Sequence, residues 1–139
     1  MSTEFVHLHV HADYSLLDGA CSIYQKSKDK TDLVKLAKEY GMPAVAMTDH
    51  GVMGGAIEFF QKMNGNAIKP IIGCEMYVSP TTIDDRDPHT PNIKGYHLVL
   101  LAKDFSGYQN LCKLNTIAHL QGHYYKPRKI GRASCRERV

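Results

Sequence analysis

The chain has 139 residues, of which 43% are hydrophobic and 22% charged, as expected for one globular domain with a core of its own. No apolar run approaches the roughly 20 residues that a membrane-spanning helix needs, and the first residues lack the features of a signal peptide. The four cysteines are scattered without a Cys-x-x-Cys pair, which argues against a zinc knuckle or a disulfide scaffold. We therefore expect a cytoplasmic protein with no membrane partner.

The formal net charge of +3 lies in residues 129–139. Basic and acidic residues balance before this segment, so the body of the chain lacks the general electrostatic footprint of a nucleic-acid-binding surface. The segment resembles the translation of a sequencing adapter, and the alternative is a genuine basic tail. We expect a partial domain over residues 1–128 and a non-native tail over residues 129–139.

Three histidines alternate at the start of the chain, where residues 5–10 are predicted to form a strand. Side chains at every second strand position share a face, so His7, His9 and His11 should project together. Neutral imidazole is a common zinc ligand and also binds manganese and iron. The alternation predicts a metal site, and the alternative is a surface strand with its polar side chains outward.

Strand and helix patterns alternate through the rest of the chain, separated by Gly, Pro and polar residues. Continuous apolar runs predict buried strands, and apolar residues at i, i+3 and i+4 predict amphipathic helices. In order, we expect a loop (13–30), a helix capped by Thr31 and stopped by Gly41 (31–40), a strand (44–48), a helix (56–63), a strand (71–78), a loop (79–95), a strand (96–102) and a helix capped by Asp104 or Ser106 and ended by Gly122.

This alternation predicts parallel βα units. Four strands and three helices are too few to close an eight-stranded βα barrel, which takes about 250 residues. We therefore expect roughly the first half of a larger, barrel-like domain.

Further metal-binding side chains fall near the ends of the predicted strands, where the active sites of βα barrels form. His9 and His11 close the first strand, Asp49 and His50 close the second, and Glu75 lies within the third. Imidazole and carboxylate together suit Zn²⁺, Mn²⁺ or Fe²⁺, and a bridging carboxylate such as Glu75 could hold two ions about 4 Å apart.

Two further candidates are Asp18, in the loop after the first strand, and His97, which opens the fourth strand instead of closing it. Several candidates have alternatives: Asp49 could cap a turn, His50 could be an ordinary loop residue, and His97 could be a packed or surface histidine. A carboxylate within an apolar strand needs a partner or a metal. Of the remaining histidines, His119 and His123 are expected to face solvent, and His89, in a loop rich in Asp and Pro, is not expected to be a ligand.

Short motifs in the chain resemble those of one known family. His-Val-His at residues 9–11, Tyr-Ser-Leu-Leu-Asp-Gly at 14–19 and Thr-Asp-His-Gly at 48–51 are similar to the PHP (polymerase and histidinol phosphatase) domain. Four more segments narrow the resemblance to the N-terminal PHP domains of bacterial DNA polymerase III alpha subunits: residues 68–75, 97–104, 107–111 and 125–128.

The resemblance implies an α/β fold, a distorted (β/α)7 TIM-like barrel of which this chain would hold roughly the first four βα units. It also implies up to three divalent metal ions, Zn, Mn or Fe, with other ligands on later strands. The implied metal ligands are His9, His11, Asp18, His50, Glu75 and His97, with His7 and Asp49 in supporting roles.

The function that the resemblance implies is that of a fragment of a DNA-directed DNA polymerase of bacterial replication. The polymerase site, with its Mg²⁺, would lie outside the fragment, and the partners would be DNA, a proofreading subunit and a sliding clamp. The PHP site would be a metal-dependent phosphoesterase, a 3′–5′ exonuclease or a scaffold. The alternatives are a stand-alone phosphatase of the histidinol-phosphatase type and an interaction module with decayed ligands.

Overall fold

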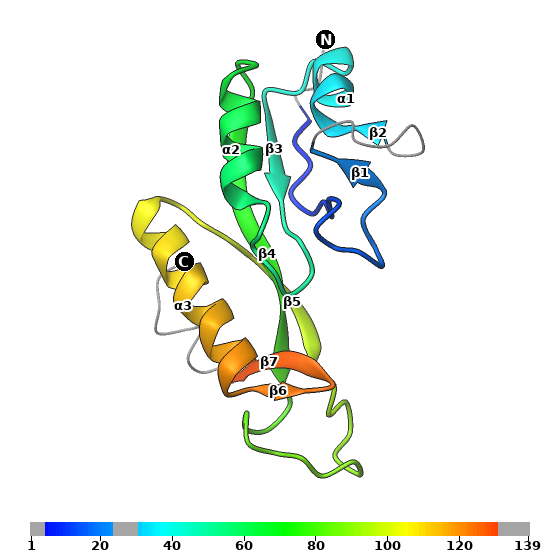
Figure 1. Cartoon of the computed structure of the whole chain (residues 1–139), viewed down its shortest axis with the longest axis vertical. Helices are drawn as coiled ribbons and strands as arrows, with labels where there is room; N and C mark the ends of the chain where they lie inside the picture. The colour runs from blue at the N-terminus through cyan, green and yellow to red at the C-terminus, as the bar shows by residue number, and fades with distance from the viewer. Residues whose placement is uncertain (1–4, 24–30, 131–139) are drawn as a thin grey trace.

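A mixed sheet flanked by helices forms the centre of the molecule (Figure 1). The computed structural model describes residues 5–23 and 31–130. A five-stranded sheet has the order β3-β4-β7-β6, with β5 paired to β4, and β1 and β2 form a separate parallel pair. The elements are β1 (Cys21–Ser22), β2 (Thr31–Asp32), α1 (Leu33–Glu39), β3 (Ala44–Met47), α2 (Ala56–Asn64), β4 (Lys69–Ser79), β5 (Tyr96–Leu101), α3 (Phe105–Leu120), β6 (His123–Tyr124) and β7 (Lys126–Ile130).

The long strand β4 joins the parts of the molecule, running from the region of α1 and α2 to that of β6 and β7 (Figure 1). Its first four residues pair in parallel with β3, from Ala44↔Lys69 to Met47↔Ile72. Farther along, Tyr77 pairs with β5 on one side and with β7 on the other. The predicted α/β class is therefore confirmed at the level of a mixed sheet with flanking helices.

Strand β5 runs antiparallel to β4, so the prediction of parallel βα units throughout was wrong at this step. The connection between these strands contains no helix, and an antiparallel pair needs no helical crossover. The hairpin formed by β6 and β7 was not predicted. Its β7 strand pairs in parallel with the end of β4.

Residues 5–10 do not form the regular strand that the sequence predicted. They run beside β3 with one bridge, His7↔Val45, and with a hydrogen bond from Thr48 N to the Val10 carbonyl. The Val10 N–H donates to the Thr48 hydroxyl at 3.0 Å instead of to a backbone carbonyl, which interrupts the ladder. The predicted loop 13–30 likewise contains β1, and its residues 24–30 lie outside the described part of the chain.

The residues that cap the helices are those that the sequence predicted, except at the start of α1. Asp32, rather than Thr31, caps α1, because its carboxylate accepts hydrogen bonds from two N–H groups of the first turn, while Thr31 pairs in β2. Gly41 follows α1 with φ of +62°, as predicted. Asp104 caps α3 by accepting from Gly107 N, which settles the choice against Ser106.

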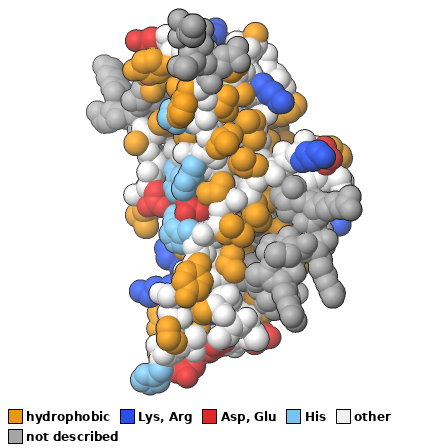
Figure 2. Space-filling view, turned by 180° about the vertical axis from the view of Figure 1, so that it is seen from behind, with side chains coloured by type: hydrophobic (Ala, Val, Ile, Leu, Met, Phe, Trp, Pro, Cys, Tyr) orange, Lys and Arg blue, Asp and Glu red, His pale blue; other side chains and the backbone are white. Residues whose placement is uncertain are grey.

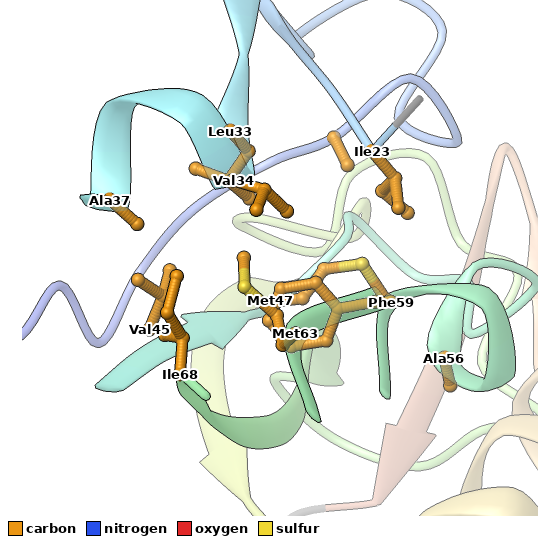
Figure 3. Close-up of a cluster of buried hydrophobic side chains, with 11 residues drawn as sticks. Ile23, Leu33, Val34, Ala37, Val45, Met47, Ala56, Phe59, Met63 and Ile68 are labelled. Carbon is orange, nitrogen blue, oxygen red and sulfur yellow. The ribbon is translucent and has the colours of Figure 1, made fainter. Parts of the chain in front are cut away.

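Two apolar clusters cover different parts of the sheet. The first joins α1, α2 and β3, with Phe59, Met63 and Met47 at its centre (Figure 3). In the second, Cys74 and Met76 of β4 pack against the α3 residues Leu111 and Leu114. Because side chains alternate along a strand, Glu75 and Tyr77 project from the opposite face of β4.

None of the described helices has the length and hydropathy that crossing a membrane requires.

Candidate metal centre

All six predicted metal ligands lie together on the face of β4 opposite α3. They form three overlapping groups, and within each group the candidate ligand atoms lie within 4.8 Å of one another. Figure 2 shows histidine and acidic side chains gathered on the surface that faces away from the viewer in Figure 1. The groups are His9, His11 and Glu75; His11, Asp18 and His50; and His50, Glu75 and His97.

The carboxylate of Glu75 is shared by two of the groups. Its Oε2 atom lies 3.1 Å from His9 Nε2 and 2.7 Å from His11 Nε2, and its Oε1 atom lies 2.8 Å from His97 Nδ1. Burial by itself would raise the pKa of Glu75, but the hydrogen bond with His9 and the charges of the neighbouring histidines outweigh it. The pKa of this carboxyl group is therefore below its usual value, and the ionised form is favoured.

The sheet register explains how residues far apart in sequence meet at Glu75. The parallel register of β3 and β4 continues past Met47 to a bridge between His50 and Glu75. On the other edge of β4, Tyr77 pairs with His97, so the first residues of β5 lie beside the last residues of β4. The antiparallel direction of β5 is therefore the reason that His97, which opens its strand, reaches the same place as residues that end parallel strands.

Asp18 is held near the histidines by a tight turn. Asp18 N and Gly19 N both donate to the Ser15 carbonyl, and Asp18 Oδ2 lies 2.6 Å from His50 Nδ1. A Cβ atom on Gly19 would lie 1.8 Å from the Ala12 carbonyl oxygen, so only glycine fits there. The hydrogen bond with His50, followed by the charges of nearby basic groups, lowers the pKa of Asp18.

Asp49 connects the segments that carry the ligands, although it belongs to none of the three groups. Its Oδ1 atom accepts hydrogen bonds from Ala12 N and from the Ser15 hydroxyl, each at 2.7 Å. The Ser15 oxygen in turn accepts from His50 N at 2.9 Å. Burial raises the pKa of Asp49 despite these hydrogen bonds. Asp49 thus braces the turn after His11 instead of capping the helix that follows it in the sequence.

His7 lies apart from the three groups. Its ring packs edge-on against Phe5 with centroids 4.7 Å apart, although it lines the same depression as His9 and His11. Its supporting role therefore remains a prediction.

The cluster fits a cation. His11 Nδ1 and His50 Nε2 are buried and have no hydrogen-bond partner among the described residues. His9 Nε2 and His11 Nε2 face each other at 3.0 Å, so their lone pairs need a shared proton or a cation between them. Imidazole nitrogens with carboxylate oxygens are a donor set for Zn²⁺, Mn²⁺ or Fe²⁺.

A family comparison agrees with this geometry. The model of the PHP domain family matches residues 7–137. The chain belongs to the PHP domain family. The match covers every residue of the cluster and extends into residues 129–137.

Three relatives of this PHP domain have the name DNA polymerase III subunit alpha. The chain is 50% identical to the protein of Treponema pallidum over 124 residues, which are 89% of this chain and 10% of that protein. It is 47% identical to the protein of Aquifex aeolicus over 133 residues (92% and 11%) and 48% identical to that of Thermus aquaticus over 137 residues (96% and 11%). The chain spans about a tenth of the length of these relatives.

Our sequence analysis missed two side chains of this PHP domain that contact the proposed ligands or a residue next to one of them. Tyr77 stacks on His50 with ring centroids 4.5 Å apart and meets His97 edge-on at 5.0 Å. Its position two residues after Glu75 was an available signal, because both must share a face of β4. His119 is exposed, as predicted, and its Nε2 atom in addition lies 2.7 Å from the Gly51 carbonyl oxygen.

His123 is exposed, as predicted, and His89 lies outside the three ligand groups, as predicted.

Proposed function

We propose that this chain is part of the alpha subunit of a bacterial DNA polymerase III and that its cluster is a metal-dependent phosphoesterase site. The observation that carries the proposal is the overlap of three ligand groups through shared residues. A carboxylate that faces two groups at once is the arrangement used to hold neighbouring ions in two-metal phosphoester chemistry. The names of the relatives do not favour a stand-alone phosphatase.

The proposed metal ligands are His9, His11, Asp18, His50, Glu75 and His97. When bound, divalent ions of this kind supply Lewis acidity towards a phosphoryl oxygen and lower the pKa of water.

The exposure of the ligands differs in a way that suits this function. The side chains of His9 and His97 are 52% and 51% exposed, whereas that of Glu75 is 6% exposed. Glu75 would therefore hold the ions from the buried side of the cluster, and a substrate would approach from the solvent side, where the two exposed histidines lie. Asp18, with 45% of its side chain exposed, would hold its ion at the solvent side of the cluster.

The complete domain is proposed to be a distorted (β/α)7 barrel. Among the described residues β5 pairs only with β4, so its outer edge is available to another strand of such a barrel. The proposed parent would bind Mg²⁺ at a separate polymerase site and would work in the cytoplasm with DNA, a proofreading subunit and a sliding clamp. Residues 129–139 are proposed to be a non-native tail, of which Lys129 and Ile130 pair with the end of β4 as part of β7.

Metal analysis of the full-length protein tests this function. We expect Zn, Mn or Fe in the protein purified without chelators, and loss of metal in a variant that lacks both His9 and His11. An H89A variant is the control, because His89 is exposed and outside the cluster. Release of nucleotides from single-stranded DNA that a chelator abolishes would identify a nuclease, and metal without hydrolysis would identify a scaffold. Absence of all three metals would contradict the proposal.

A further inference from the structure

Lys126, the first residue of β7, places an ammonium group beside the metal-ligand cluster. Its Nζ atom lies 5.4 Å from the centroid of the Tyr77 ring, and that ring stacks on His50. Lys126 forms no ion pair with any residue in the part of the chain that the structure describes. Figure 2 shows basic side chains directly below the histidine and acidic side chains of the cluster.

The local backbone fixes this position. Tyr124 pairs with Lys126 across the β6–β7 hairpin, so Tyr125 alone reverses the chain, with φ of +58°. A left-handed conformation at a residue other than glycine costs about 1–3 kcal/mol and persists only where the surroundings impose it. Parallel pairing of Arg128 with Tyr77 then places alternate residues of β7, Lys126 included, on the side of Tyr77.

The two cations of β7 differ in what they contact. The Arg128 side chain is buried, and its guanidinium donates to four backbone carbonyls, those of Gly122, Ile93, Ile83 and Asp85. Its hydrogen-bonding capacity is therefore used within the fold. Within residues 5–23 and 31–130, Lys126 has no such partners, and an aromatic face supports its charge without neutralising it.

Lys126 lies next to the cluster through Tyr77. The Tyr77 ring that faces the ammonium group also stacks on His50 and meets His97 edge-on, so one side chain separates Lys126 from two proposed ligands. An ammonium group 5.4 Å from an aromatic centroid, with no ion pair to any described residue, is suited to bind an anion that arrives from solvent. At a phosphoesterase site, that anion is the phosphate of the substrate, and lysine is a common phosphate ligand.

We propose that Lys126 binds a phosphate oxygen of the substrate while the substrate lies at the cluster. This inference rests on the proposed phosphoesterase function and adds a substrate-binding residue outside the metal ligands. The phosphate could belong to a small phosphomonoester or to a phosphodiester of DNA, and the two sources share this contact.

The test compares variants of the full-length protein loaded with Mn²⁺. K126Q removes the charge, K126R retains it, and K113Q is a matched control, because Lys113 is an exposed residue of α3, which packs on the other face of β4. Metal content is measured first, followed by calorimetric titration with inorganic phosphate and with a short single-stranded oligonucleotide. If K126Q lowers Tm, K126M replaces it, because methionine retains an apolar chain against Tyr77.

We expect K126Q to bind inorganic phosphate about tenfold more weakly at unchanged metal content, as for the loss of one charge-assisted hydrogen bond. K126R should stay within about threefold of the wild type because arginine also binds phosphate, and K113Q should not differ. Weaker phosphate binding alone supports a phosphomonoester, and weaker oligonucleotide binding as well supports a phosphodiester of DNA.

Two results would overturn the inference while leaving the proposed function intact: equal phosphate binding by K126Q and the metal-loaded wild type, or no phosphate binding by that wild type. Loss of metal in K126Q would also overturn it, because Lys126 would then support the ligands. A wild type that takes up no metal would overturn the proposed function, and the inference with it.

Discussion

Replacing the Glu75 carboxylate by an amide is expected to remove two metal ions from each chain, whereas the same change at Asp18 is expected to remove one. Glu75 belongs to two of the three ligand groups, and Asp18 belongs to one. Glutamine retains the size of the side chain but lacks the charge, and loss of a direct ligand should exceed the roughly 10–100-fold weakening that supporting residues cause. E75Q should therefore hold at most one ion, and D18N at most two.

The assay is the number of metal ions per chain, measured by mass spectrometry after dialysis of the full-length protein, with H89Q as the control. Titration of the stripped protein with Zn²⁺ or Mn²⁺ should show the same order, with E75Q losing more binding steps than D18N. Equal losses in the two variants, or wild-type metal content in E75Q, would refute the argument that Glu75 is shared by two sites.

Three further predictions concern the framework. R128M should lower the free energy of unfolding by on the order of 3 kcal/mol, because buried carbonyls lose their hydrogen-bond donor. Hydrogen exchange would detect this as faster exchange in the loop between β4 and β5. G73A should cost about 1–3 kcal/mol, since its Cβ would lie 2.6 Å from a β5 carbonyl oxygen, whereas G65A should be nearly neutral; equal melting temperatures would contradict this. Burial raises the pKa of Cys74 to about 12, so at pH 8.5 iodoacetamide should modify it only in urea, and rapid labelling of the native protein, detected by peptide mapping, would show that it is accessible.

The elements that local patterns specify were predictable from the sequence. The buried run of β3 is apolar throughout, and the candidate ligands lie in short motifs whose local spacing survives folding. His9 and His11 meet because alternate residues of an extended segment share a face, even without a regular strand. Glu75 could be singled out because a carboxylate within an apolar strand needs partners.

Features that depend on distant partners were not predictable from local patterns. The direction of β5 is decided by its pairing with β4, and only the absence of a helix before it gave a hint. The segment that forms β7 is rich in basic residues and lacks an apolar alternation, so its pairing depends on the burial of Arg128 and on the left-handed Tyr125. The contact of His119 with Gly51 likewise joins residues 68 positions apart.

The central place of β4 also determines when the cluster can assemble during synthesis. His9 leaves the ribosome first, but its contact with Glu75 spans 66 residues, and β5 and β7 must follow before both edges of β4 are paired. Because synthesis adds about 5–20 residues per second, the early histidines are present in the nascent chain for several seconds before Glu75 is made. Such distant pairings form slowly because the intervening loops must close first. Metal uptake should therefore follow the folding of this segment, and the early histidines would be open to adventitious ions until β4 is in place.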